Sequence, residues 1–245
     1  RAADFIPQLY KPYKLSQYNF GLALFWILKG LIKKVIIGDY IAVNFIDRIF
    51  DNPMMFTGFE NLMALYGYSL QVYADFSGYT DMAIGIALLM GFTLPKNFNS
   101  PYKAQNVGEF WKRWHISLSG WLKDYLYIPL GGNRGGSVGT WIALIFISAF
   151  IIMLSGKMIV LYGFIWSTII IAFLAIWIKP FRAWLTTNIN LLITMLLGGL
   201  WHGASWQFVI WGGLNGLGLI VYKLWRKISP YEKYDNAIAI VVKVF

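Results

Sequence analysis

Residues 138–178 decide the fold class, because they hold two long uncharged runs on either side of a short turn. The first run, VGTWIALIFISAFIIML, covers residues 138–154, and the second, MIVLYGFIWSTIIIAFLAIWI, covers residues 158–178. About 20 apolar residues in a helix cross the ~30 Å hydrocarbon core of a bilayer, so each run is close to a spanning length. The stretch therefore predicts a transmembrane helical hairpin.

The composition extends this conclusion to the whole chain. Of its 245 residues, 58% are hydrophobic and 13% are charged, whereas a soluble domain carries about 25% charged residues. These values exclude a water-soluble globular domain and a disordered chain. The excess of 21 Lys and Arg over 11 Asp and Glu is interpreted as cationic loops facing an anionic membrane leaflet. Nucleic acid is not an expected partner, because no polar domain is left to bind it.

The remaining apolar stretches are shorter or interrupted, and they lie at residues 20–50, 61–74, 79–92, 189–200 and 208–222. We expect broken or re-entrant helices there, with one break at residues 75–81 and another near Gly198 and Gly199. The prediction is an all-α, multi-pass integral membrane protein. Because the chain starts at Arg1 without Met and stops inside an apolar run, we expect residues 1–245 to be one domain that is incomplete at both ends.

Two local features concern packing and turns. Gly199 and Gly203, and likewise Gly212 and Gly216, have the small-xxx-small spacing that lets helix backbones approach one another. The run GGNRGG at residues 131–136 predicts a loop, which is either a plain turn or a backbone nest able to bind an anion.

A helix is predicted from Asn106 toward Tyr127, because Asn106 and Glu109 have the spacing of a capping box. At 100° per residue one face is polar and the other is apolar, so the helix is expected to lie along the membrane interface. His115 falls within the apolar face. The other members of this face are Trp111, Trp114, Leu118, Trp121, Leu122 and Tyr125.

The candidate chemical groups are the chain's two histidines, His115 and His202. His202 follows Trp201 at a predicted helix break, where an ionisable side chain at membrane depth is a functional candidate. Imidazole accepts protons near neutral pH, but either ring could instead hydrogen-bond a backbone carbonyl. No metal site is expected, because two distant histidines without cysteine do not form a ligand set.

Three aspartates lie in apolar surroundings. We expect Asp39, Asp75 and Asp81 to pair with Lys33 or Lys34, or to fix helix ends, rather than to act in catalysis.

Five motifs together resemble one family. FWKRWHISLS (110–119), DYLYIPLGGNR (124–134) and LGGLWHGASW (197–206) resemble motifs of the membrane-bound O-acyltransferases. RAADFIPQ (1–8) and DFSGYTD (75–81) resemble the bacterial branch that contains alginate O-acetyltransferase membrane subunits. Members of the family normally have further helices before and after this region. Residues 138–178 are interpreted as an inserted hairpin, because the flanking motifs lie closer together in many relatives.

The resemblance implies that an acyl group, acetyl foremost, moves from a cytoplasmic thioester such as acetyl-CoA to hydroxyls of an exported or cell-surface polysaccharide. It implies no bound cofactor, an extracytoplasmic acetyltransferase partner, and a place in the bacterial inner membrane. By motif position, His202 is the catalytic histidine and His115 is the second characteristic histidine. Substrate-binding or supporting roles are assigned to Trp201, Trp111, Arg113, Asp75, Tyr125 and Asn133.

Two alternative functions remain open at this stage. The first is D-alanyl transfer to teichoic acid, a related activity of the same superfamily; the run YIPLGGNR favours the polysaccharide-acetylating branch. The second is a proton-coupled transporter, in which broken helices and buried histidines would form the substrate path. The mechanism is open as well, because His202 could act as a general base or carry the acyl group covalently.

Overall fold

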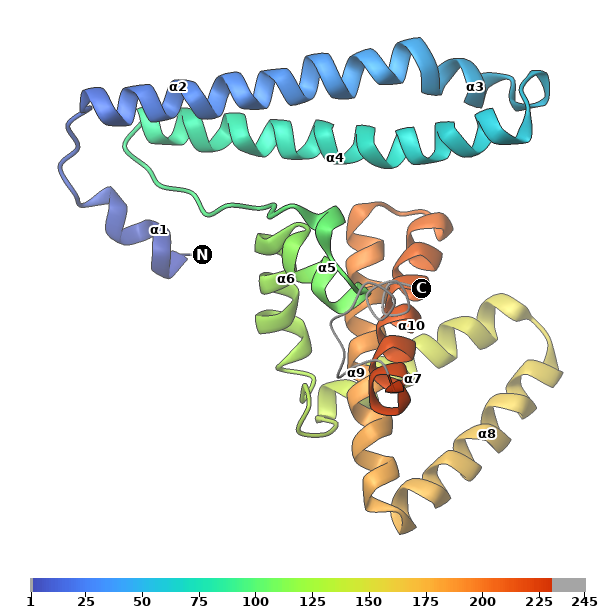
Figure 1. The fold of residues 1–245 in the computed structure, drawn as a ribbon. Helices are drawn as coiled ribbons and strands as arrows, with labels where there is room; N and C mark the ends of the chain where they lie inside the picture. Colours follow the sequence, from blue (N-terminus) through green and yellow to red (C-terminus); the bar gives the residue numbers. More distant parts are fainter. Residues whose placement is uncertain (1, 231–245) are drawn as a thin grey trace. The chain divides into compact units, whose positions relative to one another are not determined.

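The computed structural model describes residues 2–230, except for the side chains of Leu154 and Ala172. Within that range the chain forms helices and no β-strand, which confirms the all-α prediction. It divides into two compact units, Arg1–Asn99 and Ser100–Phe245, and each unit is described by itself (Figure 1).

The first unit is built on two long helical segments that run side by side, α2 and α4 (Figure 1). Thr57 begins α4 with a capping box, in which its side chain and the Glu60 carboxylate satisfy each other's backbone N–H groups. The elements are α1 (Ala2–Leu9), α2 (Gln17–Leu31), the π-helical segments η1 (Ile32–Asp39) and η2 (Ala42–Ile46), α3 (Asp47–Asp51), the 3-10 turn η3 (Pro53–Met55) and α4 (Gly58–Leu89).

Glycines allow the backbones of α2 and α4 to meet. A Cβ added to Gly78 would lie 2.7 Å from the carbonyl oxygen of Gly30, and one added to Gly85 would lie 2.6 Å from that of Ala23. Both separations are shorter than van der Waals contact. Small residues are therefore required along this seam, as in closely packed membrane helices.

Ion pairs connect the same two segments and account for the aspartates. The Asp81 carboxylate lies 2.7 Å from Nζ of Lys33 and 3.3 Å from Nζ of Lys29. Lys34 pairs with Asp75 and also lies 2.7 Å from Asp39. These contacts confirm the predicted pairing of the aspartates with lysines.

The predicted break at residues 75–81 is wrong, because α4 is continuous from Gly58 to Leu89. The physical reason is the set of ion pairs just described. Asp75 and Asp81 each find a lysine partner on the neighbouring helical segment, so the backbone does not have to unwind to accommodate them.

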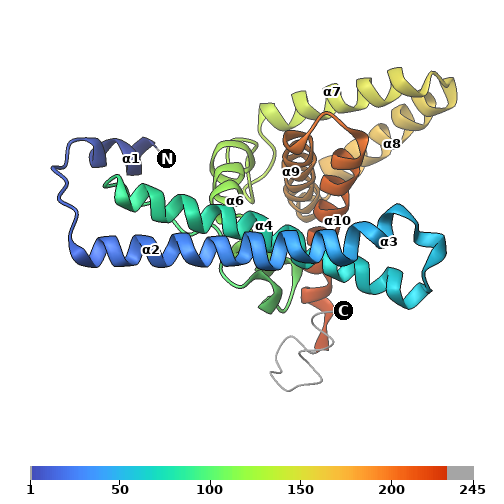
Figure 2. The same ribbon diagram turned by 90° about the horizontal axis from the view of Figure 1, so that it is seen from above.

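The second unit combines a peripheral hairpin with a central helix pair (Figures 1 and 2). The hairpin α7–α8 confirms the predicted pair of helices, and Gly156 turns the chain with a left-handed φ of 58°. The elements are η4 (Pro101–Lys103), α5 (Val107–Arg113), α6 (Ile116–Leu122), the π-helical η5 (Lys123–Tyr127), α7 (Val138–Ser155), α8 (Met158–Trp177), α9 (Lys179–His202) and α10 (Trp206–Ile228).

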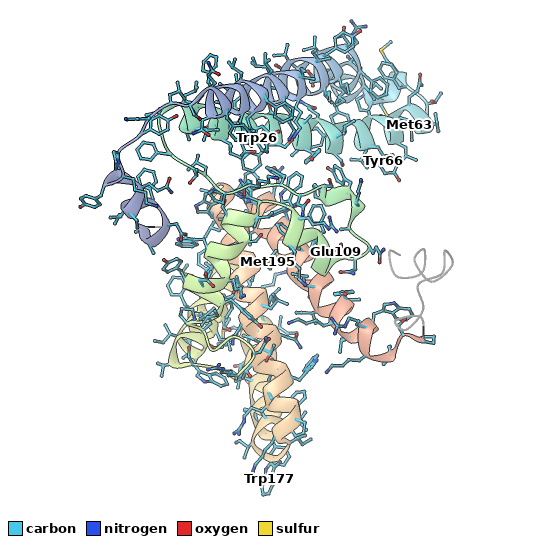
Figure 3. All side chains as sticks on the ribbon, turned by 60° about the vertical axis from the view of Figure 1, so that its left-hand side comes forward. Trp26, Met63, Tyr66, Glu109, Trp177 and Met195 are labelled. Atoms are coloured by element: carbon cyan, nitrogen blue, oxygen red, sulfur yellow. The ribbon has the colours of Figure 1, made fainter. Side chains whose placement is uncertain are left out.

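Three helices in the described part of the chain are long and apolar enough to cross a membrane: α8, α9 and α10. Most large side chains of the α7–α8 hairpin face outward; Trp177, for example, is 73% exposed and lies at the tip of the unit (Figure 3). Such a surface suits lipid rather than water. These observations agree with an integral membrane protein.

The central pair α9–α10 partly corrects the sequence reading. The sequence predicts the break near Gly198 and Gly199, which lie inside α9; the helix instead ends at His202, and α10 begins at Trp206. Helix α9, however, starts at Lys179, well before the apolar stretch that begins at residue 189. Its interior polar side chains are tolerated because they are buried against the rest of the unit, as for Asn190 at 0% exposure.

The glycine spacing acts across the two helices. Cβ atoms added to Gly199 and Gly212 would collide with the backbone of the opposite helix, and Gly216 packs on Leu192 and Met195. Gly203 has a different role, since it lies beyond the end of α9 against the ring of Phe208. The pairing of Gly203 with Gly199 on one helical face is therefore wrong.

Candidate functional site

A sharp break in the predicted helix 106–127 positions His115. Helix α5 ends at Arg113, Trp114 is extended, and His115 has a left-handed backbone with φ 42° and ψ 55° before α6 begins. A non-glycine residue in this region costs about 1 kcal/mol or more, and such strain concentrates at functional positions. The prediction of one continuous helix is wrong at this point, because neither glycine nor proline marks the break in the sequence.

The start of the segment is as predicted, with one change of partner. The side chain of Asn106 accepts a hydrogen bond from the backbone N–H of Glu109 at 2.8 Å. The Glu109 carboxylate accepts instead from the backbone N–H of Gln105 and from Arg113. These two donors lower the pKa of Glu109, the Gln105 N–H foremost. Arg113 therefore helps to hold α5 by pairing with its own helix.

The break also divides the predicted apolar face. Trp111, Leu118 and Leu122 line a cavity, whereas Trp121 and Tyr125 are 50% and 57% exposed and pack on each other. The change of direction between α5 and α6 alters the helical phase, so residues counted onto one face of an ideal helix now face two ways. Tyr125 does not line the cavity.

The cavity has a volume of about 210 Å³ and lies among α5, α6, η5, α9 and α10. Met195 on its α9 wall is labelled in Figure 3. Polar groups are few and lie among apolar side chains, which is the usual character of a small-molecule site. Its lining residues are Trp111, Leu118, Ser119, Leu122, Lys123, Tyr127, Leu191, Thr194, Met195, Gly198, His202, Trp211 and Leu219.

His202 lines this cavity from the last residue of α9. Three aromatic rings surround its imidazole. The centroid of the imidazole lies 5.0 Å from the ring centroid of Trp201, 5.3 Å from that of Trp211 and 6.1 Å from that of Phe208. The side chain is exposed, and no hydrogen bond ties the imidazole to another residue in the part of the chain that the structure describes. A purely structural histidine held by a backbone carbonyl does not fit this arrangement.

Trp201 connects the two histidines. Its ring centroid lies 6.3 Å from that of His115, and the His115 side chain is half-buried. Burial and the neighbouring imidazole of His202 lower the pKa of His115 below its ordinary value of 6.5. His115 is therefore predominantly neutral at physiological pH. The structure thus brings together two residues that are far apart in sequence.

A buried network fixes the loop at residues 131–136. The Asn190 side chain donates to the carbonyl oxygens of Gly132 and Gly135 at 3.2 and 3.1 Å, and the Thr140 hydroxyl lies 2.8 Å from its Oδ1. Because these loop carbonyls point inward to Asn190, the loop is a turn that the Asn190 side chain holds in place.

The same loop carries Asn133, whose Oδ1 accepts a 2.7 Å hydrogen bond from the hydroxyl of Tyr127. Tyr127 lines the cavity, and burial raises the pKa of its phenol. Asn133 therefore acts on the cavity through Tyr127. Sequence reasoning singled out Asn133 and missed Tyr127 and Asn190; the motif DYLYIPLGGNR contained the first of these without distinguishing it.

The other predicted supporting residues do not all lie at the cavity. Trp111 lines the cavity, and its indole N–H is buried without a hydrogen-bond partner in the described residues. Trp201 contacts both histidines. Asp75 belongs to the first unit, where it pairs with Lys34. No group of three or more His, Cys, Asp or Glu residues suited to a metal ion is found among the described residues.

Comparison with known families identifies the fold that carries this site. The sequence profile of the membrane-bound O-acyltransferase family matches residues 2–151. The chain belongs to this family. The matched range includes His115 and ends before His202.

Several curated relatives of this membrane-bound O-acyltransferase extend the likeness past residue 151. The peptidoglycan O-acetyltransferase of Helicobacter pylori is 41% identical over 209 residues, which cover 85% of this chain and 31% of that protein. The probable alginate O-acetylase of Azotobacter vinelandii is 39% identical over 227 residues, covering 92% and 35%. Both alignments cover too much of this chain to omit position 202.

A more distant relative has a different named activity. The teichoic acid D-alanyltransferase of Bacillus subtilis is 29% identical over 225 residues, which cover 88% of this chain and 46% of that protein. The chain spans about a third of the length of the two O-acetyltransferase relatives. The likeness is thus to a segment of each relative, and the part of this chain that it covers includes positions 115 and 202.

Proposed function

We propose that this segment is the histidine-bearing part of an enzyme of the bacterial inner membrane. The enzyme transfers an acetyl group from a cytoplasmic thioester, such as acetyl-CoA, to hydroxyls of an exported or cell-surface polysaccharide. The observation that carries the proposal is the accessible imidazole of His202, which lines a cavity at a helix break and has His115 as its neighbour across Trp201.

In the proposed reaction, His202 acts as a general base. A ring nitrogen of the neutral imidazole takes the proton of the acceptor hydroxyl while that oxygen bonds to the thioester carbonyl carbon. The tetrahedral intermediate collapses, the C–S bond breaks, and the thiolate receives the proton from the imidazolium. Base catalysis of this kind contributes about 10²–10⁴-fold. An acyl-histidine intermediate on His202 is the two-step version of the same transfer.

His115 and Trp111 are proposed to support the acyl carbonyl. The lowered pKa favours the neutral form of His115, whose ring carries one N–H and one acceptor nitrogen. The Trp111 indole N–H is a donor beside the cavity that has no hydrogen-bond partner among residues 2–230. Donors of this type stabilise the negative charge that develops on the carbonyl oxygen. Trp111→Phe, which keeps an aromatic ring and removes the N–H, should lower the rate by about tenfold or more.

The size of the cavity supports a short acyl group. At about 210 Å³ it is smaller than the ~300–1,000 Å³ of pockets for drug-sized ligands. D-alanyl transfer to teichoic acid is the second candidate, because a D-alanyl group is also small and a D-alanyltransferase is among the relatives. Acetyl transfer is preferred because the relatives with about 40% identity are O-acetyltransferases.

The test uses the full-length protein in a host whose own gene is deleted. Envelope and secreted glycans are treated with mild base, and released acetate and D-alanine are quantified for the wild type and for His202→Ala at matched membrane abundance. The proposal expects ester-linked acetate that disappears with His202→Ala. Release of D-alanine instead selects the second candidate, and unchanged acetate in the variant contradicts the role of His202.

A partner is also proposed. Extracytoplasmic acetyltransferases finish the transfer in the family branch that the motifs resemble, so a secreted acetyltransferase should act with this protein. Deletion of such a partner should remove the glycan ester while membrane extracts still hydrolyse the thioester donor. Loss of both activities would place the partner in donor chemistry rather than in acceptor transfer.

A further inference from the structure

The Tyr127 phenol lies at the boundary of two cavities in the Ser100–Phe245 unit. Tyr127 lines the histidine cavity. Asn133 lines a second cavity of about 490 Å³, which lies between the beginning of α9 and the end of α10. The hydrogen bond from the Tyr127 hydroxyl to Oδ1 of Asn133 joins these two walls, and it is exposed rather than buried. A ligand that extends from the histidine cavity toward the second cavity therefore passes this hydroxyl.

The loop at residues 131–136 holds Tyr127 at three points. The backbone N–H of Gly132 donates to the Tyr127 carbonyl oxygen at 2.9 Å. Gly132 also lies so close to the phenol ring that a Cβ added to it would be 3.6 Å away, and Asn133 accepts from the hydroxyl. Asn190 in turn holds the loop. Because Asn190 and His202 both belong to α9, one helix positions both the phenol and the imidazole.

Three hydroxyl groups line the histidine cavity, and each gives its proton to the protein. Tyr127 donates to Asn133 at 2.7 Å. Thr194 and Ser119 donate to backbone carbonyl oxygens four and five residues earlier, at 2.7 and 3.3 Å. A hydroxyl that has donated its proton keeps its lone pairs as hydrogen-bond acceptors. Of these three hydrogen bonds only that of Tyr127 is exposed, so its oxygen is the acceptor that a ligand can reach.

The other walls of the cavity decide which kind of ligand donates to this oxygen. A sugar ring carries several hydroxyl groups, and aliphatic walls would leave most of them without a partner. The pantetheine arm of a thioester such as acetyl-CoA carries one amide N–H two methylene groups from the sulfur, and the atoms between are apolar. One acceptor at the boundary of an apolar cavity suits this arm. The aliphatic wall residues are Leu118, Leu122, Leu191, Met195 and Leu219.

We propose that Tyr127 binds the thioester donor. Its phenol oxygen accepts a hydrogen bond from the amide N–H nearest the sulfur of the pantetheine arm, while the acyl group lies in the histidine cavity. Asn133 is a positioning residue, because it accepts the phenol proton and so leaves the lone pairs of the oxygen for the ligand. This inference rests on the proposed acetyl transfer and specifies which atom of the donor the cavity recognises.

The experiment compares two donors that differ in this N–H alone. Full-length protein in nanodiscs receives acetyl-CoA, or an analogue in which a CH₂ group replaces the amide N–H nearest the sulfur, and kcat/KM is measured for release of the thiol. The wild type should prefer acetyl-CoA about fivefold, as expected for one neutral hydrogen bond. In Tyr127→Phe the preference should disappear. The control Tyr162→Phe removes an exposed hydroxyl of α8 and should keep the wild-type preference.

Variants of Asn133 test the positioning role. Asn133→Asp keeps an acceptor for the phenol and should keep the preference for acetyl-CoA, whereas Asn133→Leu removes the acceptor and should lower the preference. Both donors are measured on the same sample, so a misfolded fraction does not change their ratio. A wild-type preference in Tyr127→Phe would overturn the proposal, and equal preferences in the two Asn133 variants would overturn the role of Asn133. Equal thiol release by the wild type and His202→Ala would instead contradict the proposed acetyl transfer.

Discussion

The α2–α4 pair and the α9–α10 pair solve the same packing problem in different ways. In both, glycines let two helix backbones touch, at Gly30 and Gly78 in one pair and at Gly199 and Gly212 in the other. The first pair neutralises its ionisable side chains against each other, as Asp81 does with Lys33. The second pair leaves an imidazole facing a cavity.

The difference shows how to weigh an ionisable residue in an apolar sequence. Asp81 and His202 are both ionisable residues that lie between apolar stretches of the sequence. Asp81 is buried with partners close enough to balance its charge, whereas His202 has aromatic neighbours that offer no such balance. We therefore assign a stabilising role to Asp81 and keep the chemical role of His202 as a proposal.

The largest effect on stability is expected at the ion pair of the first unit. Asp81→Asn leaves the ammonium of Lys33 without its buried counter-charge, and breaking such a pair costs about 3 kcal/mol. The free energy of unfolding of the purified protein in detergent should fall by this amount. The control is Asp39→Asn, because its half-exposed carboxylate shares Lys34 with Asp75 and should matter by at most about 1 kcal/mol. Equal losses of stability in Asp81→Asn and Asp39→Asn would show that the buried ion pair contributes no more than the exposed one.

Glycine contacts should give the next largest effect. In Gly212→Ala the new Cβ meets the carbonyl oxygen of Met195, so α9 and α10 must separate, at a cost of about 1–3 kcal/mol. Gly218→Ala on the same helix has open space around the new methyl group and should stabilise the protein by up to about 1 kcal/mol through helix propensity. Unfolding temperatures of both variants test this, and destabilisation by Gly218→Ala would contradict the packing account.

The loop at residues 131–136, which Asn190 holds in place, provides a test with a smaller and more local effect. Asn190→Ala removes two hydrogen bonds to loop carbonyls, which should cost about 1–2 kcal/mol. It should also speed proteolysis at residues 131–136. The control is Asn215→Ala, because within residues 2–230 the Asn215 side chain donates only to the Trp211 carbonyl of its own helix. Proteolysis at the wild-type rate in Asn190→Ala would show that the loop is held by other contacts.

The sequence predicted features that depend on neighbouring residues. The α7–α8 hairpin follows from two uncharged runs, and the helix start at Asn106 follows from its side-chain cap. The helix break near Gly198 and Gly199 is predicted to within a few residues, since α9 ends at His202. In each case the deciding interactions lie within a few residues, so periodicity and capping rules apply.

The errors concern contacts between distant residues. Asp75 and Asp81 suggested a break that lysines of the neighbouring helical segment make unnecessary. Asn190 is one polar residue in an apolar run of the sequence, and the partners of its side chain lie 50 to 58 positions away. For the site, motif resemblance selected His115 and His202, but the left-handed backbone at His115 had no local sequence signal.

The smallest expected effect is a pH dependence of stability. Burial lowers the pKa of His115 in the folded protein, so protons bind the unfolded chain more readily. Stability from this group is complete above the ordinary value of 6.5 and is lost as pH falls through the lowered folded value. Unfolding temperatures measured from pH 8 downward should fall less steeply in His115→Gln than in the wild type. Identical slopes would show that His115 is not buried as a neutral group.

The most direct test of the central claim compares the two helix pairs by rate. Acetyl transfer by full-length His202→Gln and Asp81→Asn is measured per folded molecule, with unfolding curves recorded in parallel. We predict that His202→Gln loses about 10²–10⁴-fold in rate at wild-type stability, and that Asp81→Asn loses stability at the wild-type rate. A wild-type rate of acetyl transfer in His202→Gln, together with a large loss of that rate in Asp81→Asn, would contradict the account.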